Sequence, residues 1–389
     1  MKILLIRLSA IGDVVRTLPA LSCLRRAYPT AHIDWAVEEP STELVADQAD
    51  LDGILVFPRR RLSRVLLHPG ELPSAWAHLV DFTRSLKEAR YDLVIDFQGT
   101  LKSGLIAWMT RAPRRAGLGP GHARELSYLF YNDRLRLPRR KKMNRVERAL
   151  ALVRHLGVAT EGAAARIPEK PGDAAHVEAF LSSLPAAEGG PAAPAVIFPG
   201  TSRTQQYKRY PAGHFTRVAD LMAERAGVPV VIAWGPGEEE LAGQVLRSMH
   251  RSATLAPSLT LGQLTALIRR SSVFVAGDTG PMHIAWTVGT PLVAVYGPTD
   301  PVLNRPGGRF STVAYSKVHC SPCRTRGCIA RTCLERLAPE TVAEAAIGVM
   351  HAALADAPAS RRTERKQGPV GGIRHETMGP GTRAGQYQP

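Results

Sequence analysis

The sequence lacks any apolar run close to the ~18 residues that a bilayer-spanning helix needs. Its longest apolar run, around residues 228–234, has the length of a buried strand. The apolar N-terminus carries Arg7 and Asp13 and has no small-residue cleavage site, so it does not fit a secretory signal. We therefore expect no integral membrane segment and a cytoplasmic location.

Cysteine is scarce, with five residues in a chain of 389. Four of them share one short segment, spaced C-x2-C-x4-C-x4-C: Cys320, Cys323, Cys328 and Cys333. Thiols of a cytoplasmic protein stay reduced, which argues against a disulfide framework. Four thiols suit zinc or an iron–sulfur centre, but the spacing differs from the paired C-x2-C of a zinc ribbon. Metal binding by these cysteines is a minor alternative, and we expect no metal site.

Two nucleotide-binding motifs are absent, the P-loop G-x-x-x-x-G-K-[ST] and the dinucleotide motif G-x-G-x-x-G. The first half also has few aromatic residues placed to stack bases, and no helix-turn-helix, RRM or KH pattern. Yet the formal charge is 50 − 34 = +16, which predicts an anionic partner. Because the basic residues concentrate in the first half, phosphorylated lipid headgroups explain the charge as well as nucleic acid does.

What the sequence does contain is a regular alternation of short apolar strands and amphipathic helices. A length of 389 residues, with 44% hydrophobic and 22% charged residues, indicates two or three folded domains. The expected strands lie at residues 2–8, 33–37, 53–57, 92–96, 195–198, 228–233, 273–276 and 292–296. The expected helices lie at residues 74–89, 176–184, 212–225, 239–249 and 261–269. This order predicts an α/β protein with two doubly wound parallel sheets.

The amino-acid composition along the chain also predicts where the domains begin and end. Residues 157–194 are rich in Ala, Gly, Pro and Glu, as interdomain connections often are. We predict a first domain at 1–165, a connection at 166–194 and a second domain at 195–357. Residues 358–389 have almost no large apolar side chains, which predicts a disordered basic tail.

Ligands of doubly wound sheets bind beyond the carboxyl ends of the strands. The first strand is followed by Ser9-Ala-Ile-Gly-Asp13, where Asp13 is either a helix cap or a general base. The strand at 195–198 is followed by Pro199-Gly-Thr-Ser202 and by Lys208. These N–H groups, hydroxyls and ammonium suit phosphate oxygens, although a Gly-Thr-Ser turn is often only structural.

The strand at 273–276 leads into the sequence Gly277-Asp-Thr-Gly-Pro-Met-His283, in which Pro281 is suited to the first turn of a helix. A helix N-terminus preceded by glycine binds anions, whereas Asp278 and Thr279 alone would be read as caps. After the strand at 228–233, acidic residues including Glu239 either accept hydrogen bonds from sugar hydroxyls or favour a helix N-terminus.

Taken in order, these motifs resemble the bacterial lipopolysaccharide heptosyltransferases, the ADP-heptose glycosyltransferases with the two-domain GT-B fold. The resemblance runs from residue 1 to about residue 350. It rests on KILLIRLSAIGDVVRTLPAL, IDWAVEE, YDLVIDFQGTLKSGL, RELSYLFYN, FPGTSR with KRYP, GDTGPMHIA and VYGPTDP. The pieces IDWAVEE and RELSYLFYN look most like heptosyltransferase I, which adds heptose to Kdo of Kdo-lipid A.

The resemblance implies two Rossmann-like domains that face a cleft, and Asp13 as the base of an inverting transfer. The residues that it assigns to the ADP-L-glycero-D-manno-heptose donor are Thr201, Ser202, Lys208, Glu239, Asp278, Thr279, Gly280 and His283. Those that it assigns to the anionic Kdo-lipid A acceptor are Arg59, Arg60, Arg61, Arg124 and Arg148. It implies that no cofactor is required.

The resemblance further implies a peripheral place at the inner face of the cytoplasmic membrane, with no nucleic-acid partner. Two alternatives stay open at this point. One is heptosyltransferase II or another ADP-heptose transferase with a different acceptor. The other is a non-catalytic nucleotide- or nucleic-acid-binding protein that retains the fold, because fold alone does not determine function.

Overall fold

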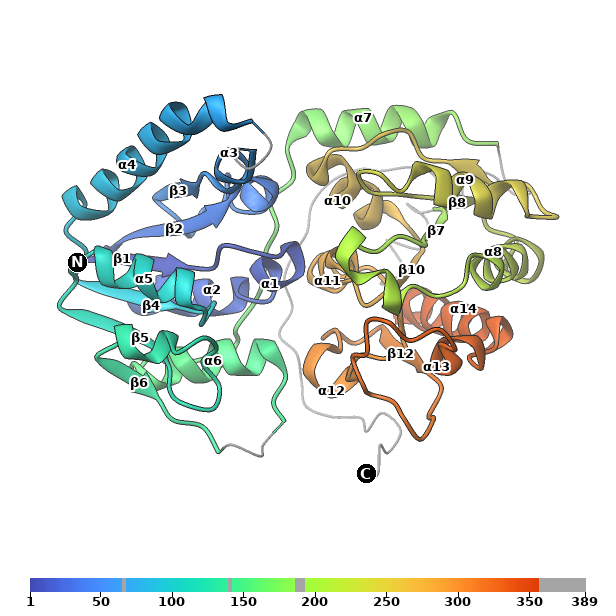
Figure 1. The fold of residues 1–389 in the computed structure, drawn as a ribbon. Coiled ribbons are helices and arrows are strands. Elements are labelled where there is room, and N and C mark those ends of the chain that lie inside the picture. The colour runs from blue at the N-terminus through green and yellow to red at the C-terminus, as the bar shows by residue number, and fades with distance from the viewer. Residues whose placement is uncertain (65–67, 139–141, 186–192, 357–389) are drawn as a thin grey trace.

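The computed structural model describes residues 1–64, 68–138, 142–185 and 193–356; the tail predicted at 358–389 lies outside the described residues. Two six-stranded parallel sheets, each with helices on both faces, stand side by side (Figure 1). This arrangement confirms the predicted α/β class with two doubly wound sheets. In the described part of the chain, none of the helices is long and apolar enough to cross a membrane.

The first sheet has the strand order β3-β2-β1-β4-β5-β6. Its strands are β1 (Lys2–Ile6), β2 (His32–Glu38), β3 (Gly53–Phe57), β4 (Leu93–Asp96), β5 (Arg114–Leu118) and β6 (Asp133–Leu135). The order reverses between β1 and β4, where Ile3 pairs with Leu93 and Ile6 with Asp96. This reversal is the point at which doubly wound sheets bind ligands.

Two layers of helices cover the first sheet. The segments near one face are α1 (Ile11–Val15), α2 (Leu18–Ala27), η1 (Glu39–Leu44) and α6 (Arg145–His155). The other face carries α3 (Arg59–Arg64), η2 (Pro69–Glu71), α4 (Leu72–Glu88), α5 (Leu101–Met109) and η3 (Ser127–Phe130). Alternate residues of β1 point to opposite faces, so Ile3 and Leu5 join the first layer and Leu4 and Ile6 the second.

The second sheet repeats this order, as β12-β11-β10-β7-β8-β9. Its strands are β7 (Ala195–Phe198), β8 (Val230–Ile232), β9 (Thr254–Leu255), β10 (Val273–Gly277), β11 (Leu292–Tyr296) and β12 (Ser311–Tyr315). One face carries α8 (Ala212–Ala226), α9 (Glu239–Arg247), α13 (Thr332–Glu335) and α14 (Pro339–Asp356). The other carries α7 (Pro171–Ser182), α10 (Leu261–Arg270) and α11 (Gly280–Thr287), while η4 (Arg203–Lys208) and α12 (Pro301–Asn304) follow β7 and β11.

Local sequence explains several of these boundaries. Helices α5 and α10 begin with reciprocal capping boxes, made by Thr100 with Ser103 and by Thr260 with Gln263. Helix α8 ends at Gly227, whose φ of 62° is the left-handed conformation that favours glycine. The apolar pattern did not reveal β5, β6, β9 or β12, which carry charged or hydroxyl residues; β6, β9 and β12 are edge strands.

Within the predicted connection at 166–194, helix α7 packs against α10 of the second sheet. Arg270 of α10 pairs with Glu169 at 2.5 Å and with Glu178 at 2.9 Å. Part of the connection is therefore attached to the second sheet through buried apolar and ionic contacts.

The two halves also touch directly, where α1 packs against α11 (Figure 1). A β-carbon at Gly12 would lie 2.6 Å from Cδ2 of His283, and one at Gly280 would lie 2.8 Å from Cγ2 of Ile11. Glycine at both positions allows the loops that follow β1 and β10 to meet.

Candidate active site

A cavity of about 700 Å³ lies between the two sheets, at the carboxyl ends of β1, β7 and β10. Nine of the residues selected from the sequence line it: Asp13, Arg59, Thr201, Ser202, Lys208, Asp278, Thr279, Gly280 and His283. They come from both halves of the chain. The fold thus brings the proposed base and most of the proposed donor groups to one cavity.

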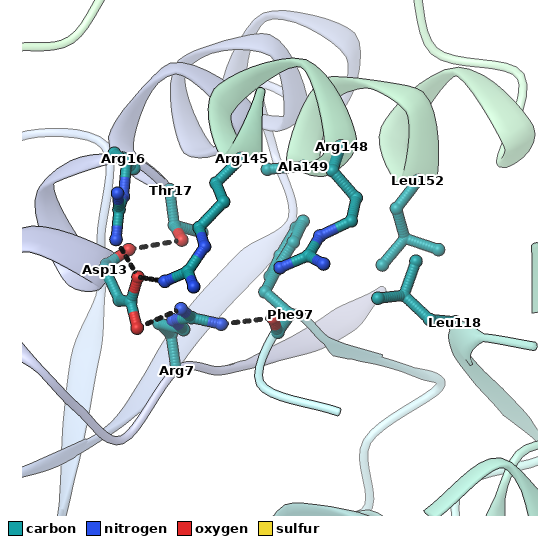
Figure 2. Close-up of a pocket in the computed structure, with 10 residues that line it drawn as sticks. All are labelled: Arg7, Asp13, Arg16, Thr17, Phe97, Leu118, Arg145, Arg148, Ala149 and Leu152. Carbon is teal, nitrogen blue, oxygen red and sulfur yellow. Dashed lines mark hydrogen bonds and ion pairs between the residues drawn. The ribbon is translucent and has the colours of Figure 1, made fainter. Parts of the chain in front are cut away.

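Asp13 lies in the first turn of α1 and does not cap it, because Ala10 is the N-cap residue and makes no side-chain hydrogen bond. Its carboxylate instead contacts three guanidinium groups (Figure 2). Arg7 approaches one oxygen at 2.6 Å, and Arg145 approaches the other at 3.1 Å together with Arg16. The capping alternative for Asp13 is therefore wrong.

This arginine cluster controls the ionisation of Asp13. Burial by itself would raise the pKa of the carboxyl, but the positive charges of Arg7, Arg16 and Arg145 outweigh it and hold the pKa well below its ordinary range. Asp13 is accordingly ionised at neutral pH. The same charges reduce its basicity.

Arg148 lies in a crevice of about 10 Å³ next to Asp13, between the end of β4 and α6 (Figure 2). Burial, followed by the charges of Arg145 and Arg7, lowers its pKa to about 10. Within the described chain its guanidinium makes no hydrogen bond, while Arg7 donates to the carbonyl of Phe97. An unpaired cation beside three paired ones favours an additional anionic group at this place.

A chain of buried polar groups joins Asp13 to the second sheet. Arg16 donates from Nη1 to Oδ1 of Asn304 at 3.0 Å, and Asn304 donates from Nδ2 to Oδ2 of Asp278 at 3.2 Å. The same Asp278 oxygen lies 3.4 Å from Nζ of Lys208. Burial lowers the pKa of Lys208, and the charge of Asp278 opposes this effect.

Three threonine hydroxyls on the cavity wall are buried and have no hydrogen-bond partner among the residues that the structure describes. They belong to Thr201 after β7, Thr279 before α11 and Thr299 after β11. Thr279 is the N-cap residue of α11 but makes no side-chain cap, so its hydroxyl is not used at the start of the helix. Unused donors at the start of a helix fit an anionic ligand such as a diphosphate.

The structure corrects the position of the acidic residue after β8. Glu239 is exposed at the start of α9 and does not line the cavity, whereas Glu238 does. Glu238 accepts from the amide of Gly235 at 3.2 Å and lies so close to Gly200 that any side chain there would collide with it. Burial raises the pKa of Glu238. The two consecutive side chains face different directions, so Glu238 lines the cavity and Glu239, which the resemblance assigns to the donor, does not.

His283 lines the cavity and is almost fully buried. Burial, and then the positive charge of Arg16, lower its pKa well below the ordinary value, so the ring is neutral at neutral pH. It packs on Gly12 and accepts from the indole of Trp286 at 3.4 Å. Because the His283 ring is neutral, it adds no positive charge to the cavity, and its contact with Gly12 packs the two halves of the chain together.

The predicted acceptor arginines separate into two groups. Arg59 lines the cavity, 2.7 Å from the buried carboxylate of Glu38, and Arg148 lies beside Asp13. Arg61 contacts His78 at the surface, and Arg124 is exposed on the loop after β5; neither lines the cavity. The side chain of Arg60 lies outside the described residues.

Three of the four clustered cysteines, Cys320, Cys323 and Cys328, lie on the segment between β12 and α13, and Cys333 lies in α13 itself. Burial, followed by the neighbouring thiols of Cys323 and Cys320, raises the pKa of Cys333. Among the residues with described positions, no group of three or more His, Cys, Asp or Glu side chains is arranged to hold a metal ion. Arg324 and Arg326 of the same segment line the cavity.

The sequence analysis did not select Arg7, Arg16, Arg145, Glu238 or Asn304 as site residues. One signal was available for Arg7, a charged residue near the end of a buried strand. No local signal marks Arg145 or Asn304, which reach Asp13 and Arg16 from 132 and 288 residues away.

Two Rossmann-like sheets share a cavity that has a carboxylate on one side and buried cationic and hydroxyl groups on the other, an arrangement suited to a glycosyltransferase that uses a nucleotide sugar. A family model, glycosyltransferase family 9 (heptosyltransferase), matches residues 79–334. The chain belongs to this family and is a glycosyltransferase.

Individual known proteins are similar to this chain over a larger part of its length than the family model. Lipopolysaccharide heptosyltransferase 1 of Pseudomonas aeruginosa is 34% identical over 84% of this chain and 87% of its own. The E. coli heptosyltransferase WaaC has been solved with ADP; its structure is 26% identical, with a TM-score of 0.69 over 88% of this chain and 98% of its own. Its complex with ADP-2-deoxy-2-fluoro heptose is 27% identical, with a TM-score of 0.64 over the same shares. These neighbours identify the two-sheet architecture as GT-B.

Proposed function

We propose that this protein transfers L-glycero-D-manno-heptose from ADP-heptose to Kdo of Kdo-lipid A, with inversion at the anomeric carbon. The observation that carries the proposal is that Asp13 from the first sheet and Lys208, Asp278 and Thr279 from the second line one cavity. The similarity to a lipopolysaccharide heptosyltransferase 1, and to structures that contain ADP and an ADP-heptose analogue, supports the choice of donor and acceptor.

In this proposal the donor binds to the second sheet. The ammonium of Lys208, the hydroxyls of Thr201 and Ser202, and the first amides of α11 hold the diphosphate. They stabilise the negative charge that develops on ADP as the bond from its β-phosphate oxygen to the heptose breaks. Asp278 anchors heptose hydroxyls, and Glu238 faces the nucleoside or sugar side. We infer that these groups act without a metal ion.

The acceptor approaches from the first sheet. The Kdo hydroxyl attacks the anomeric carbon of heptose while its proton passes to the Asp13 carboxylate, and ADP leaves from the opposite face. The acceptor is itself anionic, and its carboxylate suits the unpaired Arg148 and the adjacent Arg145. If Arg145 turns from Asp13 to this carboxylate, Asp13 gains basicity when the acceptor is bound.

The proposed acceptor is a membrane lipid, so we place the reaction at the inner face of the cytoplasmic membrane. The net charge of +16 favours an anionic membrane surface. A protein of this kind would bind peripherally and reach the sugar of a lipid that stays anchored.

The test is ADP release by the purified protein with ADP-heptose and one of three acceptor conditions: Kdo-lipid A, the same lipid already carrying one heptose, or none. We expect turnover only with the unheptosylated lipid, unchanged by EDTA. Turnover only with the heptosylated lipid would reassign the protein to heptosyltransferase II. Loss of turnover in EDTA would contradict the metal-independent mechanism, and no release in any condition would contradict ADP-heptose transfer.

A further inference from the structure

Five large apolar side chains are exposed on the outer side of α5 and η3, over the first sheet. They are between 42% and 60% exposed: Leu101, Leu105, Trp108, Leu126 and Leu129. The three on α5 are spaced i, i+4 and i+7, which places them on one face of the helix. Single exposed leucines are common in soluble proteins, whereas a set on two packed segments indicates an interaction surface.

The two segments of this α5–η3 surface are fixed to each other by close packing and a hydrogen bond. A β-carbon at Gly104 of α5 would lie 2.9 Å from Cδ2 of Phe130, so glycine allows η3 to pack closely on the helix. The backbone amide of Leu101 donates to the Glu125 carboxylate at 3.1 Å. Glu125 and Leu126 both have left-handed backbones, with φ of 53° and 57°, which is unfavourable for residues that carry a β-carbon. The loop keeps Leu126 exposed despite this cost.

The part of the chain that contains α5 and η3 has an excess of positive charge. Residues 56–136 contain 14 Lys and Arg and 7 Asp and Glu, so their net charge is 14 − 7 = +7. Arg111 follows α5 and Arg124 precedes η3; both are exposed. Neither guanidinium makes an ion pair or a side-chain hydrogen bond with any residue that the structure describes. They are therefore free to contact anionic groups outside the protein.

The α5–η3 surface also adjoins the active-site cavity. Lys102, next to Leu101, lies 2.5 Å from the buried carboxylate of Glu38, which also binds Arg59. Glu38 and Arg59 line the cavity. A short polar path thus runs from the exposed apolar side chains to the cavity rim.

We propose that the α5–η3 surface docks onto a bilayer of anionic phospholipid, with its leucines and Trp108 in the interfacial region and its arginines on the headgroups. Apolar side chains combined with unpaired cations are complementary to such a bilayer, whereas an apolar protein surface would leave the cations unpaired. The inference rests on the proposed function in one respect: docking here would bring the cavity rim to a lipid-anchored acceptor.

The test compares the full-length protein with the double variant Leu105→Ser/Trp108→Ser. Ile329→Ser is the control, because Ile329 is 97% exposed and lies in the other half of the chain. Sedimentation with phosphatidylcholine vesicles, with or without phosphatidylglycerol, measures binding. We expect binding only to the anionic vesicles, weaker at high salt, and weaker by about tenfold or more in the double variant than in wild type or Ile329→Ser.

Equal binding of wild type and the double variant would overturn the proposal. So would a change of oligomeric state in the double variant with unchanged vesicle binding, because that would make a second copy the occupant. Binding that requires Kdo-lipid A in the vesicle would assign the surface to the acceptor instead. Transfer to a water-soluble, deacylated acceptor should be equal in wild type and the double variant. Since sedimentation needs no heptose transfer, failure of the proposed reaction would be seen separately.

Discussion

The guanidinium of Arg16 donates to the side-chain oxygen of Asn304 at 3.0 Å, and it also contacts the carboxylate of Asp13. Arg16 belongs to the half of the chain that carries the proposed base, and Asn304 to the half that carries the donor groups. Because Asn304 also donates to Asp278, this single hydrogen bond connects the two sides of the cavity. The resulting alignment of base and donor is the basis of the first prediction.

We expect Asn304→Ala and Arg16→Lys each to lower kcat/KM, and the double variant to lose less than the product of the two single losses. Both changes disturb the bond between Arg16 and Asn304, so this part of their effects should not add, with a coupling energy of about 1 kcal/mol or more. A double-mutant cycle on kcat/KM for ADP-heptose measures it. Effects that multiply would show that the two residues act independently.

Asp13→Asn should lower kcat at least ~100-fold, the scale of a lost general base. The amide keeps the shape of the carboxylate among the three arginines, so ADP affinity should stay close to that of wild type. Turnover and calorimetric titration with ADP measure the two effects, with the exposed Asp81→Asn as control. Near-normal turnover of Asp13→Asn would remove Asp13 from the mechanism.

The pH dependence of kcat should respond to Arg145. Its positive charge helps to hold the pKa of Asp13 low, so Arg145→Gln should raise that pKa. Asp13 would then be protonated at a higher pH, and the acid limb of the kcat profile should move to higher pH. Arg225→Gln, on α8 of the other half, is the charge-matched control. An acid limb that stays in place or moves to lower pH would contradict the assignment.

Lys208→Ala should weaken ADP-heptose binding by more than about tenfold, because it removes a buried cation from the proposed diphosphate site. The exposed Lys87→Ala on α4 is the control for a general loss of charge. Calorimetry with ADP and with ADP-heptose gives the affinities directly. Unchanged affinity of Lys208→Ala for both ligands would argue against its role in donor binding.

The adjacent residues Glu238 and Glu239 offer a matched pair. Glu238→Ala should weaken donor binding about tenfold, the scale of a lost hydrogen bond to a charged group, because Glu238 lines the cavity. Glu239→Ala should bind the donor like wild type. Equal losses in both variants would indicate an effect on α9 rather than on the site.

Much of the fold could be predicted from the sequence. Buried strands such as β1 and β4 are marked by apolar runs, and the loops that follow β1, β7 and β10 carry the glycines and polar residues of the site. Parallel strands bring their carboxyl ends to one edge, so residues after several strands could be expected to meet. The short strands β5 and β6 were missed because their charged residues hide the apolar pattern.

The chain by itself thus determined the alternation of strands and helices and two sheets of similar size, and it predicted Asp13 and Lys208 as residues of the cavity that the structure shows. Only the tertiary structure decided what surrounds them. Arg145 and Asn304 reach the site across sequence separations that no local period encodes, and they set the charge around Asp13 and link it to Asp278. The choice of Glu238 over Glu239 likewise depends on the direction of each side chain at the start of α9, which packing determines.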